Sequence, residues 1–360
     1  MKKFLTLMLA LSMVLSLVAC GNKTEETQAA KPADEKTEAP AAETPETPAS
    51  DLKVAMVCSG SLGDTGIFDM GEAALKQAAE DFGITYKVLE GKNDPSLYYE
   101  MLNLAASQFD LVFVNPGYQF DSYLEEIGTT YPDVTFVYAD GVSSVDMENV
   151  ISVSYLENEG SYLAGVMAAM MTTRTDYQGI NEEKVLGFVG AVDSTTIHNF
   201  LTGFEQGVAA VDSEIKVLPV YVGDYNDPAT GKELALSLYD QGADIIYAAA
   251  SNSGDGVSEA AVEQGKNDIG VDTDKSFQAP ENVMGSMLKN VTKSFYDVID
   301  AKNSGAELAA EQRYGLAKKW VEMYFIDSMA EFLPEDVMAA VEKAEADIVS
   351  GAITVQEATN

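Results

Sequence analysis

The sequence predicts an α/β protein of two lobes, each built on a doubly wound parallel sheet, joined by several hinge crossings. Three observations predict this fold class. From residue 52 onward, short apolar runs alternate with amphipathic stretches of helical spacing. The alternation starts again near residue 175, and further helix-prone segments remain after both rounds are complete. The remaining segments indicate that the chain crosses between the lobes more than once.

The first round of strands and helices fills residues 52–171. The run at 111–114 is apolar throughout, which is typical of a parallel strand covered on both faces. Strands are expected at 52–58, 84–89, 111–114, 135–138 and 150–154. Helices are expected at 68–82, 98–107, 123–130 and 159–171, where apolar residues recur at helical spacing.

The second round has the same alternation. Strands are expected at 185–189, 216–222, 244–249 and 269–271. Helices are expected at 197–211, 231–239 and 257–264. Two helix-prone segments follow at 286–303 and 335–349, and the stretch between them at 318–325 is strand-like.

Two βαβ lobes with leftover crossing segments are the architecture of the type I periplasmic-binding-protein fold. The expected first lobe comprises residues 51–172 and 275–328, and the second comprises 173–274 and 329–360. Ligand is then expected in the cleft between the lobes, outside the carboxyl ends of the strands.

The N-terminal 50 residues are expected to lie outside this fold. Lys2 and Lys3 precede an apolar stretch that is too short to span a bilayer, and the stretch ends in Leu17-Val18-Ala19-Cys20-Gly21. This pattern is a lipobox, so residues 1–20 are predicted to be a lipoprotein signal peptide and Cys20 the acylated residue. The alternative is an ordinary secretory signal with an incidental cysteine. Residues 21–50 lack large apolar side chains and are expected to form a disordered tether on the extracytoplasmic face of the cell membrane.

Composition excludes several classes of function. The chain has 58 acidic and 22 basic residues, and its formal net charge of -36 repels nucleic acid. His198 is the one histidine, whereas most acid–base and metal chemistry depends on histidine. No Cys or His cluster has metal-ligand spacing, and Cys58 lies in an apolar run typical of a core strand. We therefore expect no enzyme activity, no metal and no cofactor.

The loop after the first expected strand, Gly60–Gly66, is the first candidate for ligand contact. Its glycines follow the spacing G-x-x-G-x-x-G rather than the G-x-G-x-x-G of dinucleotide-binding loops. One interpretation is a flexible connection that binds nothing. The other is a ligand loop, in which Asp64, Phe68 and Asp69 face the cleft; we predict these three residues to bind ligand.

Two phenylalanines near the start of the expected helix at 197–211 are the second candidates. Phe200 and Phe204 lie four residues apart, and aromatic residues at this spacing are usually core. Their position near the helix start also allows one of them to face the cleft. We predict that Phe200 contacts ligand and that Phe204 is core.

The remaining candidates lie where other expected elements begin or end. Asn115 directly follows the strand at 111–114, and Asn252 and Gly254 lie in a run of small polar residues, where glycine lets a ligand approach the backbone. Asp272 follows a short strand, and its carboxylate is suited to accept hydrogen bonds from a sugar diol, although a solvated turn is the alternative. Lys289 is a lone cation at an apolar helix start, where it binds a ligand oxygen or pairs with a nearby Asp.

Several phrases of the sequence resemble one known family. They are Asn158-Glu159-Gly160-Ser161-Tyr162-Leu163-Ala164-Gly165, Gly187-Phe188-Val189-Gly190, Gly203-Phe204-Glu205-Gln206-Gly207, Gly242-Ala243-Asp244-Ile245-Ile246, Gly270-Val271-Asp272-Thr273-Asp274, Leu288-Lys289-Asn290-Val291 and Ile348-Val349-Ser350-Gly351. Their order and spacing resemble the basic membrane protein family of lipoproteins, which includes the purine nucleoside receptors of ABC transporters. The resemblance covers nearly all of residues 52–355.

The resemblance implies a nucleoside site between the lobes. By position, Phe68 and Phe200 would stack on the base, Asp272 and Lys289 would hold the ribose hydroxyls, and Gly254 would offer its backbone. The segment Asp64-Thr65-Gly66-Ile67-Phe68-Asp69 differs from the family's Asp-x-Ser-Phe-Asn: it is one residue longer, lacks the serine and ends in Asp.

The resemblance also implies partners. An ABC permease and its ATPase would receive the solute, and the N-terminal lipid would hold the protein at the membrane. The alternatives are a surface receptor or antigen on the same fold without transport, and a site for a different small sugar-containing ligand.

Overall fold

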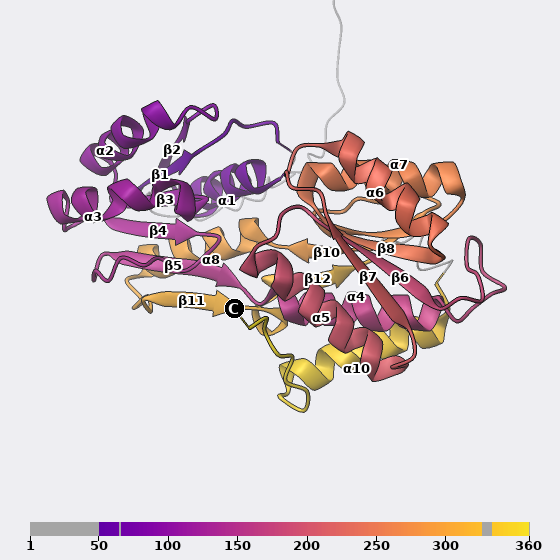
Figure 1. The fold of residues 1–360 in the computed structure, drawn as a ribbon. Helices are drawn as coiled ribbons and strands as arrows, with labels where there is room; N and C mark the ends of the chain where they lie inside the picture. Colours follow the sequence, from indigo (N-terminus) through magenta and orange to yellow (C-terminus); the bar gives the residue numbers. More distant parts are fainter. Residues whose placement is uncertain (1–49, 65, 326–332, 360) are drawn as a thin grey trace, which may run out of the picture. The chain divides into compact units, whose positions relative to one another are not determined.

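Two six-stranded sheets form the framework of the computed structural model (Figure 1). The structure describes residues 50–64, 66–325 and 333–359. Cys20, the expected signal peptide and all of the expected tether except its last residue lie outside these ranges. Among the described residues, no helix combines the length and the apolar character needed to cross a membrane.

The first sheet has six parallel strands in the order β11-β5-β4-β3-β1-β2. The strands are β1 (Lys53–Cys58), β2 (Thr85–Glu90), β3 (Leu111–Asn115), β4 (Thr135–Ala139), β5 (Val150–Tyr155) and β11 (Glu311–Tyr314). Its helices are α1 (Ile67–Phe82), α2 (Tyr98–Gln108), α3 (Asp121–Thr130) and α8 (Val291–Ser304). Alternate residues of β1 pack to opposite faces, Met56 in the apolar cluster with α1 and α8, and Val57 in the cluster with α2 and α3.

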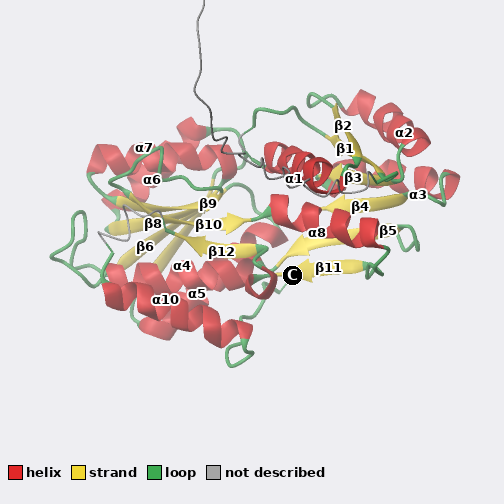
Figure 2. Cartoon of the chain, turned by 180° about the vertical axis from the view of Figure 1, so that it is seen from behind, coloured by secondary structure: helices red, strands yellow, loops and turns green. Residues whose placement is uncertain are grey.

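The second sheet has the order β12-β10-β9-β8-β6-β7, and all neighbours are parallel except β12, which is antiparallel to β10. Its strands are β6 (Val185–Gly190), β7 (Lys216–Tyr221), β8 (Ala243–Ala249), β9 (Asn267–Asp272), β10 (Val283–Lys289) and β12 (Val321–Tyr324). Helices α6 (Pro228–Asp240) and α7 (Asp255–Gln264) cover one face. Helices α4 (Glu157–Met171), α5 (Thr195–Val211) and α10 (Glu335–Val349) cover the other, as Figures 1 and 2 show.

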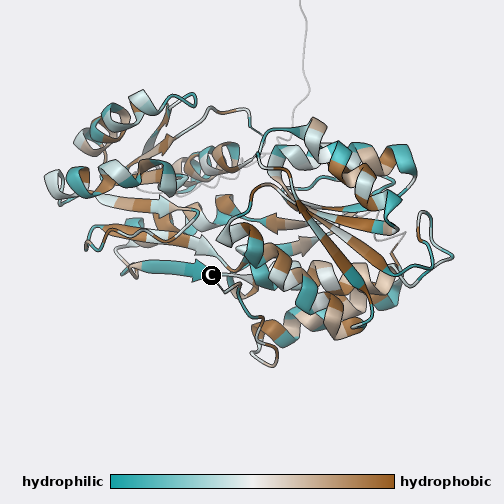
Figure 3. Ribbon diagram, in the orientation of Figure 1, coloured by the Kyte–Doolittle hydropathy of each residue, from teal (hydrophilic) through white to brown (hydrophobic). Residues whose placement is uncertain are grey.

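Strand burial explains why the apolar runs become central strands. Every residue of β3, β5, β6 and β8 is buried, because helices cover both faces of each sheet. Figure 3 shows the same pattern as hydrophobic colour along the strands. The Cys58 thiol is fully buried, and burial raises its pKa to about 12, so this side chain belongs to the core, as predicted.

Both sheets have the strand order of a doubly wound fold, which confirms the predicted fold class. The order β2-β1-β3-β4-β5 in the first sheet is repeated as β7-β6-β8-β9-β10 in the second. In each sheet the order reverses once, between β1 and β3 and between β6 and β8. A ligand crevice is expected at these two reversal points, outside the carboxyl ends of the strands.

The chain passes between the sheets three times, and these crossings correct the expected lobe boundaries. The crossings lie between β5 and α4, between β10 and α8, and between β11 and β12. Strands β10 and β12 therefore belong to the second sheet, although residues 275–328 were expected in the first lobe. Helix α4 also packs against α5 and α10 of the second sheet rather than on the first.

The expected helix at 286–303 is wrong in its first part. Residues 283–289 form β10, whose Met287 pairs with Val271 of β9 and with Met323 of β12. The helix begins only at Val291, where the Asn290 side chain accepts a hydrogen bond from the backbone N–H of Lys293 at 3.0 Å. The apolar run Val283–Leu288 is compatible with either structure, and pairing with two neighbouring strands decides it. Strand β11 was not predicted at all.

Three glycines bring helices α4 and α5 into backbone contact. A Cβ at Gly203 would overlap the carbonyl of Asn158, and one at Gly207 would overlap that of Tyr162. A Cβ at Gly165 would in turn overlap the carbonyl of Phe204. The two helices can approach this closely only because these three positions carry no side chain.

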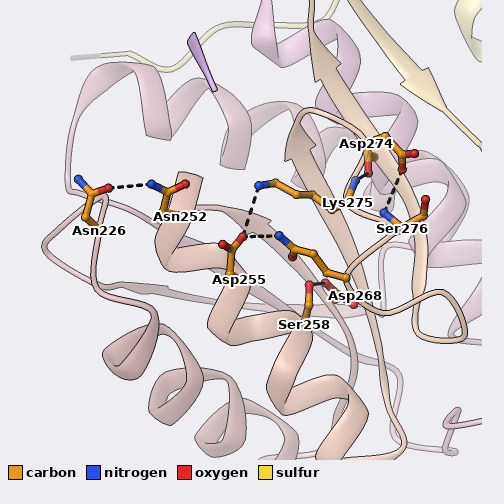
Figure 4. A network of polar contacts seen from close by, with 10 residues as sticks. Asn226, Asn252, Asp255, Ser258, Asp268, Asp274, Lys275 and Ser276 are labelled. Atoms are coloured by element: carbon orange, nitrogen blue, oxygen red, sulfur yellow. Dashed lines mark hydrogen bonds and ion pairs between the residues drawn. The ribbon is translucent and has the colours of Figure 1, made fainter. Parts of the chain in front are cut away.

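A buried carboxylate in β9 gives a prediction about pH. Asp268 is fully buried; one oxygen accepts a hydrogen bond from the Ser258 hydroxyl at 2.7 Å (Figure 4), and the other has no partner in the described part of the chain. Burial raises the pKa of Asp268 to about 7, from the 3.8 of an exposed Asp. Between these values the folded state holds a proton that the unfolded state has lost, so the free energy of unfolding falls as pH rises.

We expect Asp268→Asn to remove this decrease in the free energy of unfolding with rising pH. Wild-type protein should lose up to about 1.4 kcal/mol per pH unit through this group between pH 4 and 7. The variant should be the more stable protein at pH 8, with a smaller advantage at pH 4, measured by urea unfolding across the range. Asp240→Asn, at an exposed position on α6, is the matched control and should keep the wild-type profile. Parallel profiles for wild type and Asp268→Asn would contradict the prediction.

Candidate ligand-binding site

A cavity of about 520 Å³ lies where the carboxyl ends of both sheets meet. This volume is in the range of small-molecule sites. Residues at or beyond the carboxyl ends of β1, β2, β3, β4, β6, β7, β8, β9 and β10 contribute to its walls, so both reversal points of strand order open into it. Its lining includes Ser59, Gly60, Asp64, Phe68, Asn93, Pro116, Tyr118, Gln119, Asp140, Thr196, Ile197, Phe200, Tyr225, Asn226, Ser251, Asn252, Val271, Asp272 and Lys289.

The loop after β1 is held by its own carboxylates. Asp64 accepts hydrogen bonds from the backbone N–H groups of Gly66, Phe68 and Asp69 at 3.0, 3.2 and 3.1 Å, which places it at the N-terminus of α1. Asp69 accepts one from Gly63 at 2.7 Å. Asp64 lines the cavity, whereas Asp69 is not among the lining residues. Hydrogen bonds from Asp64 and Asp69 therefore fix the conformation of this loop, which is not the flexible connection of the first interpretation.

Two phenylalanines on equivalent helices of the two sheets line the cavity. Phe68 is in the first turn of α1, after β1, and Gly60 leaves room for its ring because a Cβ there would overlap it. Phe200 is in the second turn of α5, after β6. Each phenylalanine thus lies on the helix that follows the first strand of its sheet.

Phe204 lies in the core rather than at the cavity. It is fully buried, and its ring stacks on that of Tyr247 with centroids 5.0 Å apart. The structure therefore separates the two phenylalanines of α5 as the sequence analysis expected, with Phe200 at the cavity and Phe204 behind it.

An ion cluster forms one wall of the cavity. The Lys289 ammonium, only 4% exposed, pairs with Asp140 and lies 3.4 Å from a Glu157 oxygen. It also lies 4.9 Å from the centre of the Tyr155 ring. Burial alone would lower the pKa of Lys289, but the neighbouring carboxylates raise it above its usual value, so this side chain is a cation. One cation is thus buried among several acids.

Burial raises the pKa of two acidic side chains in this cluster. Burial raises the pKa of Glu157 to about 7, against the opposing charge of Lys289. Burial also raises the pKa of Asp272, which lines the cavity with its backbone in the left-handed region at φ 71°. In this buried cluster the Lys289 ammonium donates hydrogen bonds and the ionised carboxylates accept them. A hydroxyl group of a ligand can pair with either, because it both donates and accepts.

Three predicted ligand residues do not line the cavity. The Asn115 amide is buried and donates to the Ile67 carbonyl at 3.0 Å, so it positions the start of α1 instead. Gly254 is buried at the end of the 3₁₀ turn Ser251–Gly254, and Asp69 supports the first loop. Asn252 does line the cavity, and its amide donates to Asn226 at 2.9 Å (Figure 4).

The sequence analysis missed several lining residues. Asp140 directly follows β4, Tyr118 and Gln119 follow β3 and its Pro116, and Tyr225 follows β7. Each lies just beyond the carboxyl end of a strand, so the position rule for doubly wound sheets was the signal that could have identified them. In the described residues, no group of three His, Cys, Asp or Glu side chains is arranged to hold a metal ion.

Comparison with known proteins identifies the family. The model of the Bmp family, described as "ABC transporter substrate-binding protein PnrA-like", matches residues 51–359. The ABC transporter nucleoside-binding protein BmpA of Lactococcus lactis subsp. cremoris is 31% identical over 281 residues, which cover 73% of this chain and 76% of that protein. Basic membrane protein D of Borreliella burgdorferi is 30% identical over 250 residues, 68% of this chain and 70% of that protein.

Solved structures support the fold. An ABC transporter solute-binding protein from Aeropyrum pernix superimposes with a TM-score of 0.71 at 22% identity, over 86% of this chain and 94% of that one. Another from Conexibacter woesei gives 0.66 at 21% identity, over 85% and 99%. The fold is thus that of the type I periplasmic binding proteins, and the chain belongs to the Bmp family of PnrA-like ABC transporter substrate-binding proteins, which bind solutes and are not enzymes.

Proposed function

We propose that this protein is a lipid-anchored, extracytoplasmic receptor that delivers a purine nucleoside to an ABC importer. Cys20 would carry the lipid, and residues 21–50 would tether the binding lobes to the membrane. An ABC permease and its ATPase would be the partners. The nucleoside-binding protein of Lactococcus lactis, at 31% identity, supports the ligand class.

The observation that carries the proposal is a pair of phenylalanines, one from each sheet, that line one cavity. Phe68 belongs to the first sheet's α1 and Phe200 to the second sheet's α5. A flat base between them would bury both of its faces, and aromatic stacking adds about 0.5–1.5 kcal/mol per pair beyond the area buried. Because the rings come from different lobes, a base would join the lobes directly, which suits binding by hinge closure.

The ion cluster would hold the sugar. Asp272 and Lys289 both line the cavity, and the ammonium is held by Asp140, which also lines the cavity, and by the buried Glu157. The carboxylate accepts hydrogen bonds from ribose hydroxyls, and the ammonium donates to their oxygens. The hydroxyls would replace hydrogen bonds to water with charge-assisted ones in a sheltered site.

Isothermal titration with adenosine, guanosine, inosine and cytidine tests the proposed ligand. We expect a purine nucleoside to bind with a Kd near micromolar, which corresponds to about -8 kcal/mol. Cytidine should bind more weakly because its single ring offers less area for stacking. The proposed ligand class is rejected if none of the four nucleosides gives heat at low micromolar protein.

Two substitutions test the proposed contacts. Phe200→Ala and Asp272→Ala should each weaken nucleoside binding by more than about tenfold, or 1.4 kcal/mol, by loss of a stacking ring and of a diol acceptor. Phe82→Ala on α1 and Asp274→Ala, two residues beyond Asp272, are matched controls outside the cavity lining. Titration should show wild-type affinity for both controls. Wild-type affinity in the two cavity variants would refute the assignment.

A second candidate function is that of a surface antigen without transport. A relative from Listeria monocytogenes, 28% identical over 98% of both chains, is named a CD4+ T-cell-stimulating antigen. Uptake of radiolabelled nucleoside by cells with and without the gene separates the two. Reduced uptake in the deletion strain favours the importer, and equal uptake together with nucleoside binding favours the receptor.

A further inference from the structure

Two tyrosines from opposite sheets line the cavity and are not used by the proposed base and sugar contacts. Tyr118 follows β3 of the first sheet, and Tyr225 follows β7 of the second. Their side chains are 52% and 38% exposed, whereas Phe200 in the same cavity is 3% exposed. These two tyrosines therefore line the cavity while much of their surface is accessible to water.

The backbone under each tyrosine is firmly held. Ser253 accepts through its hydroxyl from the N–H of Asp227 at 2.8 Å, donates to the carbonyl of Asp224 at 2.8 Å, and donates through its N–H to the carbonyl of Tyr225 at 3.0 Å. Under Tyr118, buried Gly117 lies so close to the Tyr138 ring that a Cβ there would overlap it. Both turns are therefore held by contacts within their own lobes, while the side chains they carry remain partly uncovered.

Groups of the first sheet's loops act on the Tyr225 hydroxyl. Burial raises its pKa, and the nearby Tyr118 and Asp140 raise it further. The Ser194 side chain, at the start of α5, acts on this pKa in the opposite direction and lowers it. Tyr118 and Asp140 belong to the first sheet's loops and Tyr225 to a loop of the second, and all three line the cavity.

We propose that Tyr118 and Tyr225 close over the outer edge of the bound solute and set how slowly it leaves. Exposed aromatic rings on pre-ordered turns beside a cavity gain buried area when a ligand covers them, and little conformational freedom is lost. The pair thus adds an aromatic cover to the two phenylalanine walls. This inference rests on the proposed solute-binding function and names two contact residues that the sequence analysis did not predict.

Stopped-flow and titration measurements with inosine on the purified protein test the pair. Tyr118→Ala and Tyr225→Ala should each weaken binding about tenfold, with most of the change in the dissociation rate. Tyr225→Phe should stay within about threefold of wild type, because the ring rather than the hydroxyl covers the solute. Tyr99→Ala is the matched control: Tyr99 is also 38% exposed, but it lies on α2 outside the cavity lining.

The outcomes separate this inference from the proposed function. If wild type binds inosine and both alanine variants release it at the wild-type rate, the tyrosine cover is wrong and the nucleoside assignment stands. If wild type binds no nucleoside, the same variants are measured with the solute that most raises the melting temperature in a sugar and nucleoside library. Wild-type release rates with that solute, or a library without any stabilising compound, overturn the inference.

Discussion

Replacing Lys289 by methionine is expected to lower the free energy of unfolding by about 3–5 kcal/mol. The substitution keeps much of the apolar stem but removes the cation that pairs with Asp140 and Glu157. Glu157 is only 4% exposed, so its carboxylate would be left buried without its counter-charge. Solute binding should be lost as well, because Lys289 lines the cavity. Urea unfolding at pH 8, where Glu157 is largely ionised at its pKa of about 7, shows the largest effect.

The double variant Glu157→Gln with Lys289→Met shows whether charge is the cause. The glutamine removes the uncompensated carboxylate, so part of the lost stability should return. Lys293→Met is the matched control, because Lys293 forms a half-exposed pair with Asp297 at i,i+4, and its loss should cost less than about 1 kcal/mol. Equal losses for Lys289→Met and Lys293→Met would contradict the argument.

Truncating Phe204 to alanine is expected to cost about 3–5 kcal/mol of stability and to leave solute affinity nearly unchanged. The ring is fully buried and stacked on Tyr247, whose hydroxyl hydrogen-bonds Ser161 of α4 at 2.9 Å. The tight contact of α4 with α5 limits how far the core can collapse into the space left behind. Thermal and urea unfolding measure the loss, and titration measures the affinity.

Phe200→Ala is the natural comparison for Phe204→Ala, since it removes the same ring from the same helix. Phe200 faces the cavity, so its removal should cost less stability and more affinity. A large loss of affinity for Phe204→Ala with unchanged stability would contradict the assignment of Phe204 to the core.

Much of the fold was predictable because apolar periodicity and burial agree along most of the chain. The expected strands at 111–114 and 244–249, for example, became the fully buried strands β3 and β8. Strand β10 escaped prediction because only Lys289 and Asn290 separate its apolar run from α8, and periodicity does not encode a pairing partner. The short β11, with only Gln312 buried, carries little hydrophobic signal.

Lining residues could be predicted from the sequence where a residue type suited to ligand binding lies near the carboxyl end of an expected strand. Phe68, Phe200, Asp272 and Lys289 line the cavity, and the family identified from the sequence is confirmed by comparison. Asn115 and Asp69 follow the right strand or loop, yet their side chains bond to nearby backbone groups instead. Direction of a side chain depends on tertiary packing, which the order of residues alone does not reveal. Tyr225 and Asp140 were missed because they belong to none of the motifs considered.

The backbone contact between α4 and α5 connects the first passage between the sheets to the cavity residue Phe200. Helix α4 starts directly after the first passage between the sheets, and α5 carries Phe200. Main-chain atoms of the two helices are in direct contact at Gly165, Gly203 and Gly207. Because no side chains separate the helices at these positions, sliding of one helix along the other is hindered. A hinge rotation at this passage would therefore turn α4, α5 and Phe200 as one rigid unit, and the angle of α4 would set the width of the cavity.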